Sequence, residues 1–376
     1  NPLQQWSGFG PNSELRMPAY RYPAETIRSA GVPAGRLGDP QVMASTALGY
    51  AVRYRVYTPT GYDTLAGRLP VLFVTDGHEY APDGLGALVT VLDNLIATRQ
   101  VAPLLAVFLD PRDVNNATVN RRQSELVPPG GSRGVCNPCR ADRFLGFLTD
   151  ELIPAVDAAY RTQTGPEGRG ILGTSLGGLF AAYTGKTRPD VFGRVAIMSP
   201  AFQVWENVYA LYETPQPGGQ RLFLSQGTIS DGTGGDRLSA VLASRGYVYT
   251  YVKRNEGHSW GHWRAIEGLM LRTLFPGSAV SVTTGAATPV PGLRLDAAPN
   301  PVRTATTLRW YLGAPDHVRL SLFDTLGREV QRVEDGAFAS GTHAARISTD
   351  ALAAGSYFAR LATSDGAVST AVIVLP

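Results

Sequence analysis

The stretch GILGTSLGGLFAAYTGK, residues 170–186, decides the fold of the N-terminal part of the chain. Within it, residues 173–177 read G-T-S-L-G, a G-x-S-x-G pattern that is typical of a nucleophilic serine on a sharp strand-to-helix turn. Apolar residues 171–172 precede the pattern, and apolar side chains from Leu179 onward follow with helical spacing. We therefore expect a strand, a tight turn at Ser175 and a helix.

A second G-x-S-x-G match lies at residues 130–134, inside LVPPGGSRGVCNP. With 42 glycines in 376 residues, an accidental match is unsurprising. Ser132 is preceded by two prolines and followed by V-C-N-P, which favour neither a strand before it nor a helix after it. Sequence context therefore selects Ser175 over Ser132 as the nucleophile.

Composition narrows the class of protein. The chain has 376 residues, 44% of them hydrophobic and 17% charged, with a net charge of +3. This balance is typical of a globular protein and gives little electrostatic support for nucleic-acid binding. No apolar run reaches the roughly 18–20 residues of a membrane span, so we expect no membrane-spanning helix.

Residues 1–275 alternate between apolar runs and helical patterns. Short apolar runs are typical of parallel strands buried on both faces, and helices between them predict a three-layer αβα sheet domain of mostly parallel strands. Residues 50–59 alternate with period two and predict an antiparallel edge strand. The expected buried strands are 71–77, 104–110, 170–173, 195–200, 221–227 and 247–253, and the expected helices are 83–99, 143–160, 176–186, 236–245 and 263–274.

The pattern changes near residue 276. Residues 276–295 are small, polar and rich in proline and glycine, which predicts a linker. Residues 296–376 contain only short strand patterns, punctuated every 8–12 residues by Gly, Asp and Asn. That spacing predicts a small antiparallel β-sandwich as a second domain.

A serine nucleophile needs a base and an acid. His258, in NEGHSWGHWR, directly follows the expected strand 247–253 and is the favoured base, whereas His262 is the weaker candidate. The acid should lie between Ser175 and the base in the chain, on the loop after strand 221–227. That loop offers Asp231, which we favour, and Asp236, which can instead cap the next helix.

Two backbone N–H groups should bind the oxyanion of the tetrahedral intermediate. One is expected from Leu176, the residue after the nucleophile. The other is expected from Gly77 or His78 in DGHEY, on the loop after an early strand.

The only two cysteines form a C-x-x-C at Cys136 and Cys139. Such a pair can be a redox centre, half of a zinc site or a loop-closing disulfide. A zinc site would need two further ligands and the redox motif normally opens a helix, so a structural disulfide is favoured.

Residues 31–274 resemble the esterase-D and enterochelin-esterase-like group of α/β hydrolases, which includes feruloyl and acetyl-xylan esterases and mycolyltransferases. The resemblance implies the α/β-hydrolase fold and an oxyanion donor at the His78 backbone. It also implies a substrate-pocket or loop-anchoring role for Arg122, Glu125 and Trp260, in which Arg122 and Glu125 either form an ion pair that anchors the active-site loop or contact the substrate. It further implies a pocket wall near the two cysteines. The segments that carry it are VYTPTGYD with LPVLFVTDGHEY, RQSELVP, FLTDELIPAVDAAYR, GTSLGG and GHSWGHWR.

The tail from residue 296 resembles the type A C-terminal sorting domain of the type IX secretion system. The segments that match it are APNPVRTATTLRWYL, LSLFDTLGREV, GTHAARI and AAGSYFARL. The resemblance implies secretion, or display at the cell surface, across a bacterial outer membrane, with the secretion machinery as partner. The alternative is an accessory sandwich such as a carbohydrate-binding module.

Together these features predict a secreted serine carboxylesterase that hydrolyses acyl esters through Ser175, His258 and Asp231. Acylated plant polysaccharide, of the feruloyl or acetyl-xylan type, is the expected substrate, and the chemistry requires no metal or organic cofactor. The alternatives are a siderophore or short-chain esterase, an acyltransferase of the mycolyltransferase type, and a non-catalytic binding protein on a hydrolase fold.

Overall fold

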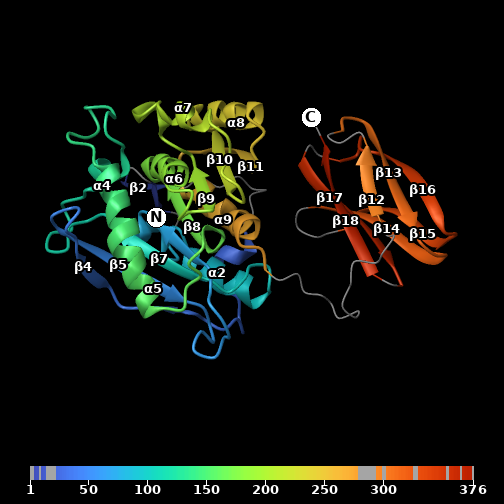
Figure 1. Cartoon of the computed structure of the whole chain (residues 1–376), viewed down its shortest axis with the longest axis horizontal. Coiled ribbons are helices and arrows are strands. Elements are labelled where there is room, and N and C mark those ends of the chain that lie inside the picture. Colours follow the sequence, from blue (N-terminus) through green and yellow to red (C-terminus); the bar gives the residue numbers. More distant parts are fainter. Residues whose placement is uncertain are drawn as a thin grey trace. The chain divides into compact units, whose positions relative to one another are not determined.

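The computed structural model describes residues 4–7, 10–13, 23–277, 294–298, 302–324, 329–352, 355–364 and 366–374. The chain divides into two compact units, Asn1–Ala279 and Val280–Pro376, each of which is described by itself (Figure 1). Most of the linker expected at 276–295 lies outside the described residues. No helix among the residues described has the length and apolar character needed to cross a membrane.

A mostly parallel sheet forms the centre of the first unit, with the strand order β11-β10-β9-β8-β6-β7-β5-β3 and β4 paired to β5. Strands β6 to β11 are mutually parallel, so their carboxyl ends meet at one edge of the sheet. Ligands of open parallel sheets bind at that edge. The strands are β3 (Arg36–Leu37), β4 (Gln41–Ala44), β5 (Ala51–Thr58), β6 (Val71–Val74), β7 (Leu105–Asp110), β8 (Arg169–Thr174), β9 (Arg194–Met198), β10 (Arg221–Ile229) and β11 (Tyr249–Gly257).

Residues 50–59 form the expected antiparallel strand, but the prediction that this strand is the edge of the sheet is wrong. Strand β5 is antiparallel to β7, as its alternating pattern predicts, but it is not the edge of the sheet. The two short strands β3 and β4 pair with its other side. They are only two and four residues long, too short to show a readable period in the sequence.

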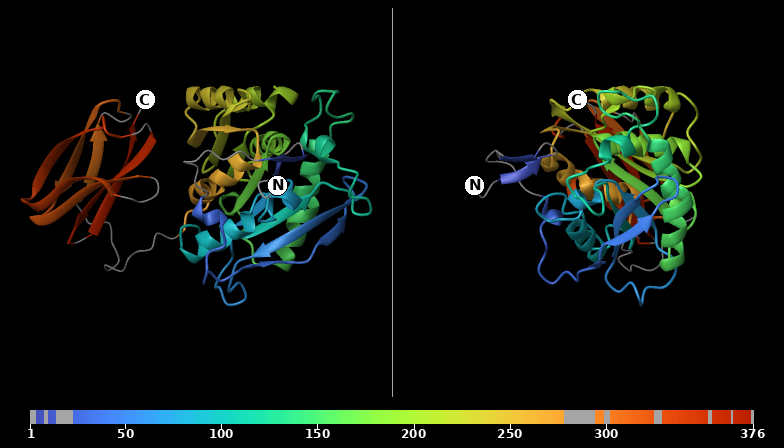
Figure 2. Two further views of the ribbon diagram at one scale, coloured as in Figure 1. Left: turned by 180° about the vertical axis from the view of Figure 1, so that it is seen from behind. Right: turned by 90° about the vertical axis from the view of Figure 1, so that its left-hand side faces the viewer.

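Helices cover both faces of this sheet, and Figure 2 shows α5 and α2 on opposite sides of it. One core joins the sheet to α4 through α8, and a second core joins the other face to α2 and α9. The three-layer prediction is confirmed. The helices are α1 (Gly77–Tyr80), α2 (Leu88–Ala97), α3 (Arg122–Leu126), α4 (Ala141–Gly146), α5 (Ile153–Ala159), α6 (Leu176–Thr187), α7 (Val208–Tyr212), α8 (Gly234–Ser244) and α9 (Trp260–Leu274), with short 3₁₀ turns at Ala24–Thr26, Pro166–Gly168 and Phe202–Val204.

The helix expected at 143–160 is a continuous helical segment with a widened centre. Phe147–Leu152 forms a π-helical turn between α4 and α5. Pro154 follows directly and has no N–H to donate, and its ring would crowd the carbonyl group of Asp150 in a regular α-helix. The wider turn accommodates this proline.

The turn between β8 and α6 is sterically demanding. Ser175 has φ 58° and ψ −118°, a conformation that L-residues rarely adopt. A Cβ atom at Gly173 would lie 2.1 Å from the Gly177 carbonyl oxygen, and one at Gly177 would lie 2.5 Å from Thr75 Oγ1. Glycine on both sides of Ser175 therefore allows β6, β8 and α6 to approach closely.

The second unit consists of two antiparallel sheets, β12-β13-β16 and β15-β14-β17-β18, around their own apolar core. This arrangement confirms the expected small β-sandwich. The first unit also contains a separate two-stranded sheet near the N-terminus, formed by β1 (Gln4–Ser7) and β2 (Gly10–Ser13). The strands of the sandwich are β12 (Arg294–Ala298), β13 (Ala305–Leu312), β14 (Asp316–Asp324), β15 (Glu329–Phe338), β16 (Gly341–Ser348), β17 (Gly355–Thr363) and β18 (Gly366–Val374).

The packing of the β8–α6 turn predicts the effect of one added methyl group. Gly173→Ala should lower the stability of the first unit by about 1–3 kcal/mol or more, because the clash is with backbone atoms that cannot move away. Gly146→Ala is the matched control, since a Cβ there meets nothing within 4 Å and the residue is helical. The control should stabilise the protein by roughly 0.5–1 kcal/mol. Chemical denaturation followed by circular dichroism measures both, and equal effects of the two changes would contradict the packing argument.

Candidate active site

A cavity of about 800 Å³ opens at the carboxyl ends of the parallel strands. Ser175 enters it from the end of β8, Asp231 from the loop after β10, and His258 from the end of β11. The three residues come from separate parts of the chain and share one cavity, because the parallel strands that precede them end at the same edge.

Asp231 and His258 form a short contact at the back of this cavity. The distance from His258 Nδ1 to Asp231 Oδ1 is 2.5 Å. The other carboxylate oxygen of Asp231 accepts hydrogen bonds from the Gly227 N–H, at 2.5 Å, and from Ser199 Oγ, at 2.7 Å. Burial alone would raise the pKa of Asp231, but these hydrogen bonds lower it below its usual value. The carboxylate is therefore charged at neutral pH and can hold the imidazole ring in one orientation.

Two residues near this pair were not expected from the sequence. Trp263 Nε1 donates a hydrogen bond to Ser199 Oγ at 2.9 Å, which leaves the Ser199 hydroxyl proton directed to Asp231. The Trp263 ring also meets the His258 ring edge-to-face, with centroids 5.0 Å apart. Ser199 directly follows β9. Its position at the end of a parallel strand is the feature of the sequence that could have identified it as a site residue. Ser199 therefore positions Asp231, and Trp263 positions His258.

Asp236 lies apart from His258. Its carboxylate accepts hydrogen bonds from Lys253 Nζ at 2.8 and 2.9 Å and from the Tyr251 hydroxyl at 2.9 Å. The hydrogen bond from Lys253 lowers its pKa, and its side chain is 40% exposed. Of the two candidate acids, the geometry brings Asp231 to the imidazole.

His262, the weaker candidate base, lies in α9 and is fully buried. Burial lowers the pKa of its imidazole to about 4, so the ring is neutral at physiological pH. It does not line the 800 Å³ cavity.

Two turns supply backbone amides near Ser175. Leu176 lines the cavity and is the first residue of α6, so its N–H has no acceptor within the helix. Gly77 and His78 likewise begin α1, after Asp76, whose φ of 53° makes the chain turn sharply. The His78 side chain does not enter this cavity but lines a second one, described below.

Arg122 joins these two turns. Its Nε donates to Asp76 Oδ1 at 2.8 Å, and its Nη2 donates to the Thr174 carbonyl at 3.2 Å. The sequence suggested a pair between Arg122 and Glu125, and the structure gives each of them another partner. Arg122 also lines the cavity, so it lies where it can both anchor the turns and contact a ligand.

Glu125 and Trp260 are buried away from the cavity. Glu125 Oε1 accepts a hydrogen bond from the Tyr50 hydroxyl at 2.6 Å, and burial raises the pKa of the carboxyl group to about 7. Trp260 packs edge-to-face against Tyr80 and Trp263 within the second core. Both positions fit the anchoring role rather than substrate contact.

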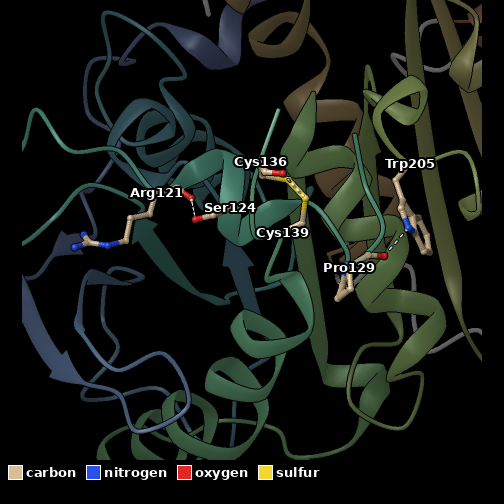
Figure 3. Close-up of a disulfide and its surroundings, with 6 residues drawn as sticks. All are labelled: Arg121, Ser124, Pro129, Cys136, Cys139 and Trp205. Atoms are coloured by element: carbon tan, nitrogen blue, oxygen red, sulfur yellow. Dashed lines mark hydrogen bonds between the residues drawn. A yellow bond between two sulfur atoms is a disulfide. The ribbon is translucent and has the colours of Figure 1, made fainter. Parts of the chain in front are cut away.

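One wall of the cavity comes from the loop between α3 and α4, which we call the wall loop (residues 127–140). A disulfide joins Cys136 to Cys139, and Trp205 Nε1 donates a hydrogen bond to the Pro129 carbonyl at 3.1 Å (Figure 3). The N–H of Ser132 donates to the Val204 carbonyl at 2.9 Å. Ser132 thus lies in a surface loop and not on a strand-to-helix turn.

No group of three or more His, Cys, Asp or Glu side chains converges to hold a metal ion within the described ranges. The side chains of Ser175, His258 and Asp231 bring a hydroxyl, an imidazole and a carboxylate into one cavity, beside the amide that begins α6. That set can carry out acyl transfer through a covalent intermediate.

Residues 45–266 match the model of the Esterase family, and residues 297–375 match the secretion system C-terminal sorting domain. The first match covers more than half of the chain. The protein therefore belongs to the Esterase family and is a carboxylic ester hydrolase. Its sorting domain indicates that it is secreted or held at the cell surface.

Known proteins with similar sequence or structure agree with this family. An endo-1,4-beta-xylanase/feruloyl esterase of Xylanibacter ruminicola is 24% identical over 229 residues, which are 58% of this chain and 29% of that protein. The enterobactin esterase of Shigella flexneri has a TM-score of 0.58 at 23% identity, covering 73% of this chain and 68% of that one. A ferulic acid esterase of the anaerobic fungus Anaeromyces mucronatus has a TM-score of 0.52 at 16% identity, covering 67% and 96%. At these identities the two structures show a shared fold.

The same substitution should have different effects at the two candidate acids, Asp231 on the loop after β10 and Asp236 in the first turn of α8. Asp231→Asn should lower kcat by about 10⁴-fold, because the amide cannot stabilise the imidazolium and favours the wrong tautomer. Asp236→Asn, the matched control, should change kcat less than about threefold, because it removes only a half-exposed ion pair with Lys253. Hydrolysis of p-nitrophenyl acetate measures both. A large loss confined to Asp236→Asn would show that the acid is misassigned.

Proposed function

We propose that the protein is a serine esterase in which Ser175 attacks the ester carbonyl and forms an acyl-enzyme. The observation that carries this proposal is the 2.5 Å contact of His258 with Asp231 in the cavity that Ser175 enters from its strained turn. With Nδ1 facing Asp231, Nε2 is the ring nitrogen available to accept the Ser175 hydroxyl proton and later to give it to the leaving alcohol. Water then repeats the attack on the acyl group and releases the acid.

The backbone N–H groups of Leu176 and His78 are the proposed oxyanion donors. Leu176 begins α6 and His78 lies in the first turn of α1, so neither amide has an acceptor within its helix. Arg122 ties the Thr174 carbonyl to Asp76 and so holds the two turns at a fixed separation. Preorganised donors of this kind stabilise charge where it develops in the transition state.

The proposed substrate is an aromatic acyl ester of plant polysaccharide, such as a feruloyl ester. The cavity volume of about 800 Å³ is sufficient for a cinnamoyl-sized acyl group. Its lining beside Ser175 is largely apolar on the side of Val135, Pro200 and Val204. Two similar proteins, a xylanase/feruloyl esterase and a ferulic acid esterase, support this class of substrate.

The proposed route to the substrate is export across an outer membrane by a type IX secretion system. The sandwich carries the sorting-domain match and is built around its own core of strands. In this proposal the sandwich acts as a secretion signal and takes no part in ester hydrolysis. An extracellular location also fits the disulfide of the wall loop.

The two G-x-S-x-G serines provide a matched test of the nucleophile. Ser175→Ala should lower kcat for p-nitrophenyl acetate and methyl ferulate by at least about 10⁴-fold, since the acyl-enzyme can no longer form. It should also abolish labelling by a fluorophosphonate probe. Ser132→Ala should retain both activity and labelling, because its side chain is exposed and its backbone bond to Val204 is kept. Retained activity in Ser175→Ala would end the proposal.

The wall loop predicts how acyl selectivity can be changed. Val135→Trp should raise KM for methyl ferulate about tenfold or more by filling the space beside Ser175. Turnover of p-nitrophenyl acetate should change less than about threefold, because an acetyl group does not reach that wall. Val248→Trp, at a valine that is 72% exposed, is the control. Equal losses on the two esters would place the acyl group elsewhere.

A further inference from the structure

A second cavity, of about 350 Å³, is lined in part by Gly77 and His78 of the α1 turn. Its lining shares no residue with the candidate active site among the residues described. Three arginines, Arg53, Arg55 and Arg112, line it together with Asp110 and the His78 side chain. None of the chemistry proposed above uses these side chains.

The sheet itself creates this cavity. Residues 53, 55 and 57 point to one face of β5 and stand opposite residues 110, 108 and 106 of β7. On that face Tyr57 and Phe108 belong to the core covered by α2 and α9. Further along, at the carboxyl end of β7, the same face carries Arg53 and Asp110, so the apolar layer gives way to charged groups. The cavity therefore lies at the edge where parallel sheets bind ligands.

The charges of the cavity are not balanced. Arg112 donates to both oxygens of Asp110, at 2.8 and 2.7 Å, and Arg53 Nη1 lies 3.6 Å from the same carboxylate. Burial alone would raise the pKa of Asp110, but the hydrogen bonds from Arg112 lower it, so the carboxylate is charged. Within the lining, one negative charge thus faces three guanidinium groups. The Glu79 carboxyl group also lies near Arg112, but burial raises its pKa to about 7, so it is only partly charged at neutral pH.

Arg55 carries the least compensated of these charges. Its Nε donates to the Gly38 carbonyl at 2.8 Å and its Nη2 to the Leu37 carbonyl at 3.4 Å. Both acceptors are neutral, and Arg55 has no carboxylate partner in the part of the chain that the structure describes. Holding a guanidinium group in this way leaves it oriented and ready to pair with an anion.

We propose that this cavity binds a carboxylate carried on a ligand of about one sugar ring, namely a hexuronic acid residue. The volume lies at the lower end of the roughly 300–1,000 Å³ typical of small-molecule sites. Guanidinium groups match the planar carboxylate fork, as the pair of Arg112 with Asp110 already shows in the cavity. The side chains of Pro82 and Phe108 offer an apolar wall for the ring, which a bare inorganic anion would leave uncovered.

The ligand would contact the turn that also serves the candidate active site. Gly77 and His78 line the second cavity, and His78 carries a proposed oxyanion amide. This link rests on the proposed function, whereas binding of the uronate itself does not. The binding test therefore uses a protein that cannot hydrolyse esters.

Binding is measured by isothermal titration of full-length Ser175→Ala protein with sodium D-glucuronate. D-Glucose and inorganic phosphate are titrated in parallel at the same ionic strength. Glucuronate should bind at least about tenfold more tightly than either, because glucose lacks the charge and phosphate lacks the ring. Glucose binding as tightly as glucuronate, phosphate binding more tightly, or no heat from glucuronate would each overturn the proposal.

Substitutions locate the binding. Arg55→Gln should weaken glucuronate binding about tenfold or more, and Arg55→Lys should retain part of it because the charge is kept. Arg188→Gln, at a surface ion pair with Asp190, is the control and should bind normally. If Arg55→Gln does not fold, Arg53→Gln takes its place, since Arg53 lines the same cavity. Unchanged binding in the folded variant would overturn the proposal.

Discussion

The backbone conformation of Ser175 is the constraint on which the rest of the site depends. A positive φ at a serine persists only where the surroundings hold it in place. The glycines on either side allow this, because any Cβ at Gly173 or Gly177 would meet the neighbouring turn or Thr75. A Cβ at Gly178 would likewise lie 2.7 Å from the Met198 carbonyl oxygen. The tight turn therefore draws the ends of β6, β8 and β9 together, and these ends place the amides and the Ser199 hydroxyl around the serine.

Much of this arrangement was readable from the sequence, because parallel strands put chain-distant residues at one edge. The order of Ser175, the β10 loop and His258 along the chain was enough to predict that they share a site. The sequence favoured Asp231 over Asp236 but did not decide between them. The choice depends on the irregular pairing of β10 with β11 between Gly227 and Ile229, after which the chain turns back and Asp231 reaches the Gly227 N–H. A bulge of this kind has no period in the sequence.

Hydrogen bonds between side chains that are far apart in the sequence could not be predicted either. Trp263 and Ser199 are 64 residues apart and meet only because α9 packs beneath the end of β9. Arg122 was expected beside Glu125, three residues away on the same short helix, but Asp76 attracts it from 46 residues away. Asp76 and Glu125 are equally buried, at 2% exposure each, so burial does not choose between them. Glu125 already accepts a hydrogen bond from the Tyr50 hydroxyl, whereas the fold brings Asp76 beside the Thr174 carbonyl that Arg122 also binds. The choice of partner therefore depends on which strand ends meet in space, which the sequence does not display.

The way in which the wall loop is attached has a consequence for how such an enzyme diversifies. Its contacts with the rest of the first unit at Pro129 and Ser132 go through main-chain atoms, and the disulfide closes its far end. Gly130 has φ 83°, and a Cβ at Gly131 would lie 2.3 Å from Val127, so these two positions require glycine. The other side chains between residues 129 and 135 are not needed to hold the loop in position. They can be exchanged in evolution or in the laboratory without disturbing the strands that carry Ser175 and His258. Because the disulfide and the main-chain hydrogen bonds hold the wall loop, substitutions that change which substrate is preferred need not alter the residues that react with it.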